Sequence, residues 1–155
     1  MSNSGVFDFL EQTLQAEGPE SVLNRLIENL RERQQLHELF DARILSKKFA
    51  LGLPLSRPSS LQDVPDKLRK DVESAYVDAA REAGEGFLKQ GDIENGWMYL
   101  QAIREPAKVA EAIDRPPDHL DDYDQLERVL RIALYEGVHP EKGIRLMLRA
   151  HGTCS

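Results

Sequence analysis

Apolar residues recur along this chain at the three- and four-residue spacing of helices, and no stretch shows the two-residue alternation of a half-buried strand. One stripe in the middle of the chain consists of Leu68, Val72, Tyr76, Ala79, Ala83 and Phe87. The pattern also predicts a short helix over residues 6–16 and a long one from Pro19 to about Leu51, since proline suits a first helical turn. An all-α protein is therefore expected.

The predicted long helix carries a stripe of its own, made of Leu23, Leu26, Leu30, Phe40 and Ile44. Such a stripe packs either on the helix's own domain or against a second copy of the chain. Arg33 and His37 interrupt the stripe, so packing within the domain is the main prediction. A homodimer through these residues remains the alternative.

Prolines and a glycine interrupt the helical pattern between residues 52 and 63, where a continuous helix would lose hydrogen bonds. We therefore expect a connector over residues 52–63, between N-terminal helices in residues 1–51 and further helices in residues 64–150, with a tail at residues 151–155. The first helix after the connector is predicted to begin near Pro65. The whole chain of 155 residues fits one domain, because about 100–200 residues fill one core.

The strongest turn signal lies at residues 91–96. Gly91 suits a left-handed helix end, and Asp92 suits the N-cap of a following helix. Gly84 and Gly96, on either side of this turn, have no side chains and would let two helices approach closely. These four residues predict a tight antiparallel helical hairpin.

Residues around this turn resemble one unit of the tetratricopeptide-repeat family over about residues 77–106: Gly84, Phe87, Gly91, Asp92, Ile93, Gly96, Leu100 and Pro106. The match has departures. Alanine is usual in that family where Gly96 stands, tyrosine is commoner where Ile93 stands, and Pro106 comes about two residues early. The resemblance implies a helical-repeat fold that binds peptides.

A second hairpin, with similar residues at its helix ends, is predicted nearer the C-terminus. Gly137 ends one helix, Pro140 begins the next, and Gly143 places a small residue in its first turn. The apolar stripe of the first of these helices consists of Tyr123, Leu126, Leu130, Ala133 and Leu134. Gly137 follows Gly91 by 46 residues, wider than the 34 of a regular array. We therefore expect antiparallel hairpins stacked as an irregular, solenoid-like domain that the N-terminal helices cap.

In tetratricopeptide proteins the first helix of each unit lines a concave groove. The resemblance carries this role to Asp78, Arg81, Glu85, Leu88 and Lys89. Arg81 and Lys89 would then be available to hold a carboxylate of a bound peptide. The alternative is a solvated helix face on which Arg81 pairs with Glu85 and Glu85 with Lys89.

Charge and composition restrict the partners. The 20 Lys and Arg against 27 Asp and Glu give a net charge of −7, which disfavours a nucleic-acid groove. No apolar run approaches the roughly 20 residues that cross a bilayer. Cys154 is the single cysteine, which is typical of a reducing compartment. We expect a cytoplasmic protein without nucleic-acid or membrane partners.

Motifs of catalysis are scarce. The sequence has no phosphate-binding glycine loop, nucleophile elbow or His-Glu-x-x-His pair. The acidic cluster from Asp114 to Asp124 and the pair His151/Cys154 near the end of the chain are the candidates for metal or thiol chemistry. We expect no cofactor and no bound metal.

The sequence thus predicts a non-catalytic protein–protein interaction or scaffold module that binds a peptide or helix in a groove between helical hairpins. The alternative is a metal- or thiol-dependent enzyme or regulator that uses the acidic cluster or the His151/Cys154 pair. Under that alternative, the chain could be the N-terminal part of a larger protein.

Overall fold

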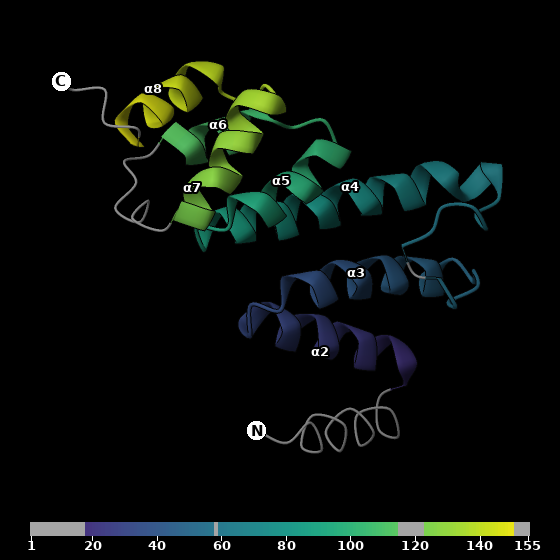
Figure 1. The fold of residues 1–155 in the computed structure, drawn as a ribbon. Coiled ribbons are helices and arrows are strands. Elements are labelled where there is room, and N and C mark those ends of the chain that lie inside the picture. The colour runs from purple at the N-terminus through teal and green to yellow at the C-terminus, as the bar shows by residue number, and fades with distance from the viewer. Residues whose placement is uncertain (1–17, 58, 115–122, 151–155) are drawn as a thin grey trace. The chain divides into compact units, whose positions relative to one another are not determined.

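The computed structural model describes residues 18–57, 59–114 and 123–150 (Figure 1). All regular structure in these ranges is helical and none of it is β-strand, so the all-α prediction is confirmed. The predicted helix over residues 6–16 and the tail at 151–155 lie outside the described residues. The chain divides into two compact units, residues 1–83 and 84–155, and the boundary lies within a helix rather than in the connector.

Unit 1 contains α2 (Pro19–Glu32), α3 (Leu36–Ala50) and the first part of α4 (Asp66–Lys89). Helices α2 and α3 lie side by side as a hairpin (Figure 1), so the single helix predicted from Pro19 to Leu51 is wrong. The chain turns at Gln34, whose φ is 59°. Its amide donates to the Arg31 carbonyl (3.2 Å), and the Gln35 amide donates to the Leu30 carbonyl (3.0 Å). This is a Schellman helix end, with glutamine in the position that glycine usually takes.

Replacing Gln34 by glycine is expected to stabilise the protein by about 0.5–1 kcal/mol. A side chain in the left-handed region costs about 1–2 kcal/mol, and the extra freedom of glycine in the unfolded chain offsets part of the gain. Urea unfolding followed by circular dichroism measures the difference. Gln34→Ala, which keeps the Cβ atom, is the control and should not show the increase.

Helices α2 and α3 bury most of the stripe predicted on the long helix, and they do so inside unit 1. Leu30, Phe40 and Ile44 are buried, and Leu23 and Leu26 are half-buried. The Phe40 ring meets the ring of Tyr76 on α4 edge to face, with centroids 5.2 Å apart. The stripe residues therefore stand on two helices rather than one. The homodimer through these residues stays a prediction.

The connector after α3 is held by a buried lysine. Lys48 is 1% exposed, and its ammonium donates to the carbonyl oxygens of Arg57 (2.7 Å) and Ser60 (2.5 Å). Farther on, Val64 is buried and α4 begins at Asp66, as the sequence predicts. One side chain from α3 thus fixes the course of a segment that has no helix of its own.

Unit 2 contains the end of α4 and the rest of the chain. Its helices are α5 (Ile93–Ala102), α6 (Ala107–Asp114), α7 (Tyr123–Leu130), the π-helical turn η1 (Arg131–Tyr135) and α8 (Pro140–Ala150). They enclose a core of Leu88, Leu100, Val109, Ile113, Leu126, Val129, Ile132, Ala133 and Leu146. Trp97 packs against this core, and Tyr99 stacks on Phe87 with centroids 5.9 Å apart.

The hairpin predicted at residues 91–96 is confirmed. Gly91 has φ 80°, and the Asp92 carboxylate caps α5 by accepting from the Asn95 amide (3.1 Å). Gly84 and Gly96 face each other across the hairpin. A Cβ atom on Gly96 would lie 3.2 Å from the carbonyl oxygen of Gly84, and one on Gly84 would lie 3.3 Å from the carbonyl oxygen of Gly96. The tetratricopeptide resemblance of this hairpin stays a prediction.

The second predicted hairpin also forms, with a difference. Gly137 has φ 71°, α8 begins at Pro140, and a Cβ atom on Gly143 would lie 2.6 Å from the Leu134 side chain. The helix before this turn ends in η1, in which the Glu136 amide donates to the Arg131 carbonyl five residues back (3.1 Å). The predicted stripe is wrong at Tyr123, the first residue of α7, whose side chain is 70% exposed and does not pack into the core.

Candidate functional site

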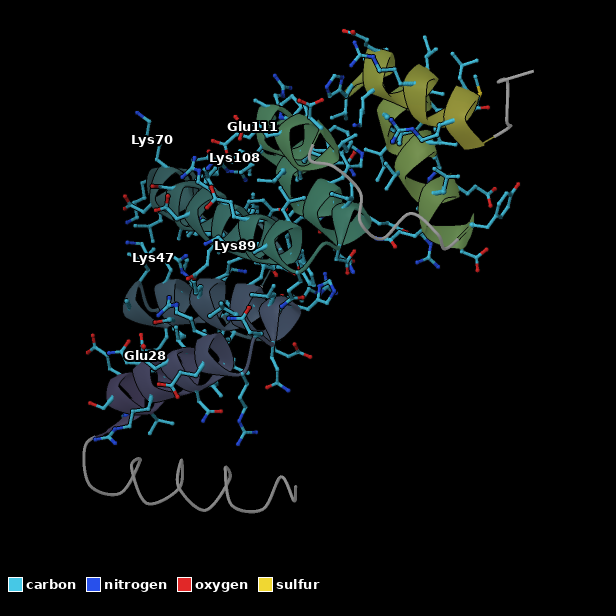
Figure 2. The ribbon with its side chains drawn as sticks, turned by 90° about the vertical axis from the view of Figure 1, so that its left-hand side faces the viewer. Glu28, Lys47, Lys70, Lys89, Lys108 and Glu111 are labelled. Carbon is cyan, nitrogen blue, oxygen red and sulfur yellow. The ribbon has the colours of Figure 1, made fainter. Side chains whose placement is uncertain are left out.

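The residues predicted to line a groove all stand on α4, but their side chains have different surroundings. In unit 1, Arg81 forms an ion pair with Asp78 at 3.3 Å. In unit 2, Glu85 pairs with Lys108 of α6, and Lys89 is exposed near the end of α4 (Figure 2). These pairs differ from the predicted Arg81–Glu85 and Glu85–Lys89 contacts.

Leu88 requires a correction, since it is 8% exposed and belongs to the core of unit 2. A Cβ atom on Gly96 would lie 2.5 Å from Leu88 Cδ2, so this side chain fills the space that the missing Cβ leaves. Leu88 therefore stabilises the hairpin and is not available to a bound peptide. The carboxylate-binding role of Arg81 and Lys89 stays a prediction.

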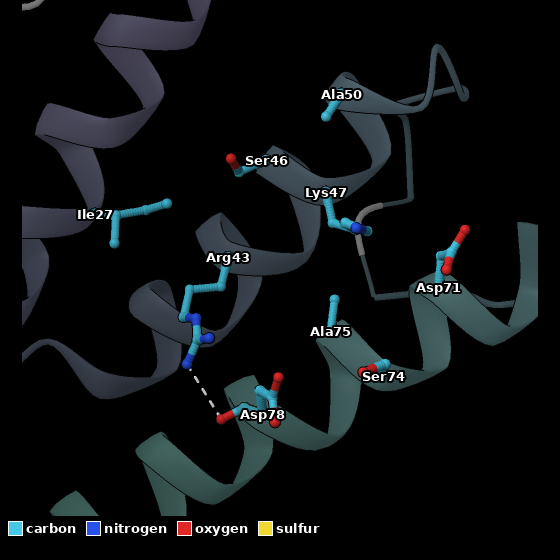
Figure 3. Close-up of a pocket in the computed structure, with 9 residues that line it drawn as sticks. All are labelled: Ile27, Arg43, Ser46, Lys47, Ala50, Asp71, Ser74, Ala75 and Asp78. Atoms are coloured by element: carbon cyan, nitrogen blue, oxygen red, sulfur yellow. Dashed lines mark hydrogen bonds between the residues drawn. The ribbon is translucent and has the colours of Figure 1, made fainter.

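Unit 1 has a polar cavity of about 360 Å³ between its helices (Figure 3). It is lined by Ile27, Arg43, Ser46, Lys47, Ala50, Asp71, Ser74, Ala75 and Asp78. The cations stand on α3 and the carboxylates on α4. Arg43 already donates to the Asp78 carbonyl (3.1 Å) and to the Glu82 carboxylate (3.0 Å). Two cations and two carboxylates line the cavity, so their charges balance and the lining favours neither an anionic nor a cationic ligand.

Glu82 is the centre of an ion-pair network in unit 1. Its carboxylate accepts from Arg31 Nε at 2.7 Å and from Arg43 at 3.0 Å. The hydrogen bond from Arg31 lowers the pKa of Glu82 below its usual value of 4.5, and partial burial opposes this shift. Because the network joins α2, α3 and α4, it stabilises the arrangement of these helices within unit 1.

Glu82→Gln is expected to make the unfolding free energy less dependent on pH in the acid range. A carboxyl group whose pKa is lowered by folding stabilises the protein above its unfolded pKa, and the stabilisation is lost as pH falls below about 4.5. Because the three side chains are partly exposed, the loss at neutral pH should be only about 1 kcal/mol. Urea titrations between pH 3 and 7 measure it. A variant with the same slope against pH as the native protein would contradict the role of Glu82.

Unit 2 has a larger groove of about 700 Å³, which we call the α7–α8 groove. It is lined by Glu94, Glu127, Arg128, Leu130, Arg131, Leu134, Tyr135, Glu136 and Met147. These side chains come from α5, from α7 with η1, and from α8. The groove is therefore built on the two hairpins of unit 2.

Apolar side chains are exposed at this groove. Tyr135 is 86% exposed and Met147 is 38% exposed, while Leu130 and Leu134 are half-buried. Helix α8 presents apolar residues on two sides. Leu146 packs into the core, whereas Met147 and its neighbours Ile144 and Leu148 are exposed. A single amphipathic stripe leaves no such second apolar side, and exposed apolar side chains at a groove are typical of interaction sites.

The π-helical turn lines this groove with Arg131, Leu134 and Tyr135. Single π-helical turns within α-helices occur frequently at functional sites. Here the turn lies directly after α7 and before Gly137. A local departure from regular helix thus coincides with the most exposed aromatic side chain of the described residues.

The cations of the groove are already bound by one carboxylate. Glu94 on α5 pairs with Arg128 at 3.3 Å and with Arg131 at 3.5 Å. Neither Glu127 nor Glu136 forms an ion pair with any residue in the described ranges. The carboxylates of the lining that have no ion-pair partner in the described residues are therefore those of Glu127 and Glu136.

Sequence reasoning did not find this groove. The available signal was in α8, where Ile144, Leu146, Met147 and Leu148 put four large apolar residues into five positions. One buried helix face needs fewer than that. The partners of α8 in the groove lie on α5, α7 and η1, and no local pattern indicates that these segments meet.

The residues proposed for metal or thiol chemistry lie largely outside the described ranges. Residues 115–122 and the pair His151/Cys154 are not described. Asp114 lies 3.4 Å from Nε2 of His139. In the ranges that are described, no three His, Cys, Asp or Glu side chains gather as metal ligands. Nor does any helix there have the length and apolar character needed to cross a membrane.

No protein-family model, curated protein or solved structure matches this chain. Its function is therefore inferred from the geometry and chemistry of its own residues.

Proposed function

We propose that this protein is a non-catalytic interaction module whose α7–α8 groove binds the apolar face of a helix in a partner protein. The supporting observation is the exposure of Tyr135 and Met147 on the lining of a groove of about 700 Å³ that is set into packed hairpins. An amphipathic helix docks in such a groove with apolar residues at positions i, i+3 or i+4, and i+7.

Burial of apolar surface would supply the free energy of binding. Full burial of a large apolar side chain contributes about 1.5–3 kcal/mol. A partner helix would cover Tyr135 and Met147, together with the exposed edges of Leu130 and Leu134. Aromatic residues and methionine are enriched at the centres of protein interfaces. Part of this gain is offset by the lost freedom of the partners.

The proposed binding surface is the α7–α8 groove rather than α4. Leu88 of that helix is buried and Glu85 is paired with Lys108, so the α4 side chains offer a partner little apolar area. The lining of the α7–α8 groove offers both apolar area and polar groups that can set the orientation of a bound helix.

A displayed library of helix-forming 18-residue peptides tests the proposal. We expect the native protein to enrich peptides that have an apolar face, and Met147→Glu to reduce their binding by about tenfold or more, since a charge would be buried in the interface. Met98→Glu is the matched control. Met98 is also an exposed methionine of unit 2, at 44% against 38%, and it does not line the groove. Equal enrichment by the native protein and Met147→Glu would contradict the proposal.

A further inference from the structure

Glu94, Glu127 and Glu136 against Arg128 and Arg131 give the lining of the α7–α8 groove a net charge of 2 − 3 = −1, and two of these carboxylates have no ion-pair partner among the described residues. Arg128 and Arg131 are paired with Glu94, whereas Glu127 and Glu136 have no ion-pair partner in the described part of the chain. The basic residues of α8 do not change this, because Lys142, Arg145 and Arg149 are not part of the lining, and Arg145 pairs with Glu141.

The two carboxylates are separated along the groove. Glu127 is on α7 and Glu136 caps η1, nine residues apart, which is roughly two helical turns. Between them along this axis are the groove residues Leu130 and Leu134, together with Arg128 and Arg131, which pair with Glu94. Glu127 and Glu136 therefore stand toward the two ends of a lining that has apolar and ion-paired side chains between them.

The π-helical turn accounts for both carboxylates lining one groove. In a regular α-helix, residues nine apart lie on about opposite sides, because 3.6 residues make one turn. A π-helical turn contains more residues, since its hydrogen bonds span five rather than four positions. The turn at Arg131–Tyr135 thus rotates Glu136 part of the way back toward the side on which Glu127 stands, and both residues line the groove.

We propose that the helix bound in this groove carries a lysine or arginine at each end of its apolar face, about seven residues or two helical turns apart so that both face the groove, and that Glu127 and Glu136 select it. This inference rests on the proposed function. Opposite charges at the ends of an apolar contact fix the direction and register of the bound helix, and like charges there are strongly unfavourable. An anionic membrane surface would face the same two carboxylates, so a basic helix is the better match.

The test uses the displayed library of the previous subsection with every position flanking the apolar face randomised. We expect the enriched peptides to carry Lys or Arg at both ends of the apolar face. The best peptide should bind the double variant Glu127→Lys/Glu136→Lys about tenfold or more weakly than the native protein at low salt. Exchanging its terminal lysines for glutamates should restore binding to the double variant and abolish binding to the native protein.

The outcomes separate this inference from the function on which it rests. Enriched peptides with an apolar face but no preference for basic ends, bound equally by the double variant, would overturn the charge selection and leave the interaction module in place. If the native protein enriches no peptide more than Met147→Glu does, the charge selection and the interaction module are both overturned. A membrane surface would be the occupant if the native protein enriches no peptides but sediments with phosphatidylserine vesicles, and Met147→Glu does not. That result would overturn the charge selection and the interaction module.

Discussion

Gly96→Leu is expected to lower the free energy of unfolding of unit 2 by about 3 kcal/mol. The first atom of any side chain at this position would lie 2.5 Å from Leu88 Cδ2 and 3.2 Å from the carbonyl oxygen of Gly84. The Leu88 side chain can rotate, but the backbone of α4 cannot move away without opening the core, and overpacked cores typically lose about 1–3 kcal/mol. The single tryptophan, Trp97, packs against this core, so its fluorescence in urea reports unit 2.

The control for this substitution is Gln101→Leu, which adds leucine at an exposed position of the same helix. It should change the stability by less than about 0.5 kcal/mol. A second test combines Gly96→Ala with Leu88→Ala. The double variant should lose less than the sum of the two single losses, because the shortened side chain makes room for the new Cβ atom. A Gly96→Leu protein with the native urea midpoint would contradict the close packing of the two helices.

Lys48→Ala is expected to lower the unfolding free energy by about 3 kcal/mol. The substitution leaves a cavity where the buried stem of the lysine packs, and it removes the donor to the carbonyl oxygens of Arg57 and Ser60. Both effects are destabilising in a buried site. Lys48→Met keeps most of the volume and loses only the hydrogen bonds, so it should cost about half as much.

Lys47→Ala is the matched control, because Lys47 is the neighbouring lysine on α3 and is only half-buried. Lys47→Ala should leave the free energy of unfolding nearly unchanged. Amide exchange gives a local readout, since the Ser60 amide donates to the Arg57 carbonyl (3.2 Å) within the anchored segment. Unchanged protection of the Ser60 amide in Lys48→Ala would show that the lysine does not hold the connector.

Helix ends were predictable where residues with special backbone chemistry mark them. Gly91 and Asp92 gave the turn at residues 91–96, and prolines gave the starts of α2, α4 and α8. The turn at Gln34 uses the same helix end as Gly91, with a left-handed residue and two backbone hydrogen bonds. Glutamine does not signal that conformation, and the apolar spacing continues through it, so the break was missed.

The environment of Lys48 could not be predicted for a different reason. It follows Lys47 in a basic segment that is typical of a solvated helix face. Its burial depends on the connector folding back over α3, which brings carbonyl groups about ten residues away to its ammonium. Helical periodicity describes the faces of one helix, and it contains no information about what a following segment covers.

The candidate site depends on contacts still farther apart in sequence. Glu94 on α5, residues of α7 and η1, and Met147 on α8 line one groove, and no local pattern in any one of these segments indicates the others. Leu88 illustrates the opposite error. The family resemblance implied that it lines a groove, whereas its contact with the Gly96 position places it in the core.

The most direct test of the central claim is methyl NMR of the native protein with a peptide from the library. On addition of the peptide, the methyl signals of Leu130, Leu134 and Met147 should shift and saturate together, while those of Leu23 and Leu26 on α2 stay unchanged. Met147→Glu should abolish these shifts and Met98→Glu should preserve them. Shifts that leave the three groove methyls unaffected and appear on α2 or α3 instead would contradict the account.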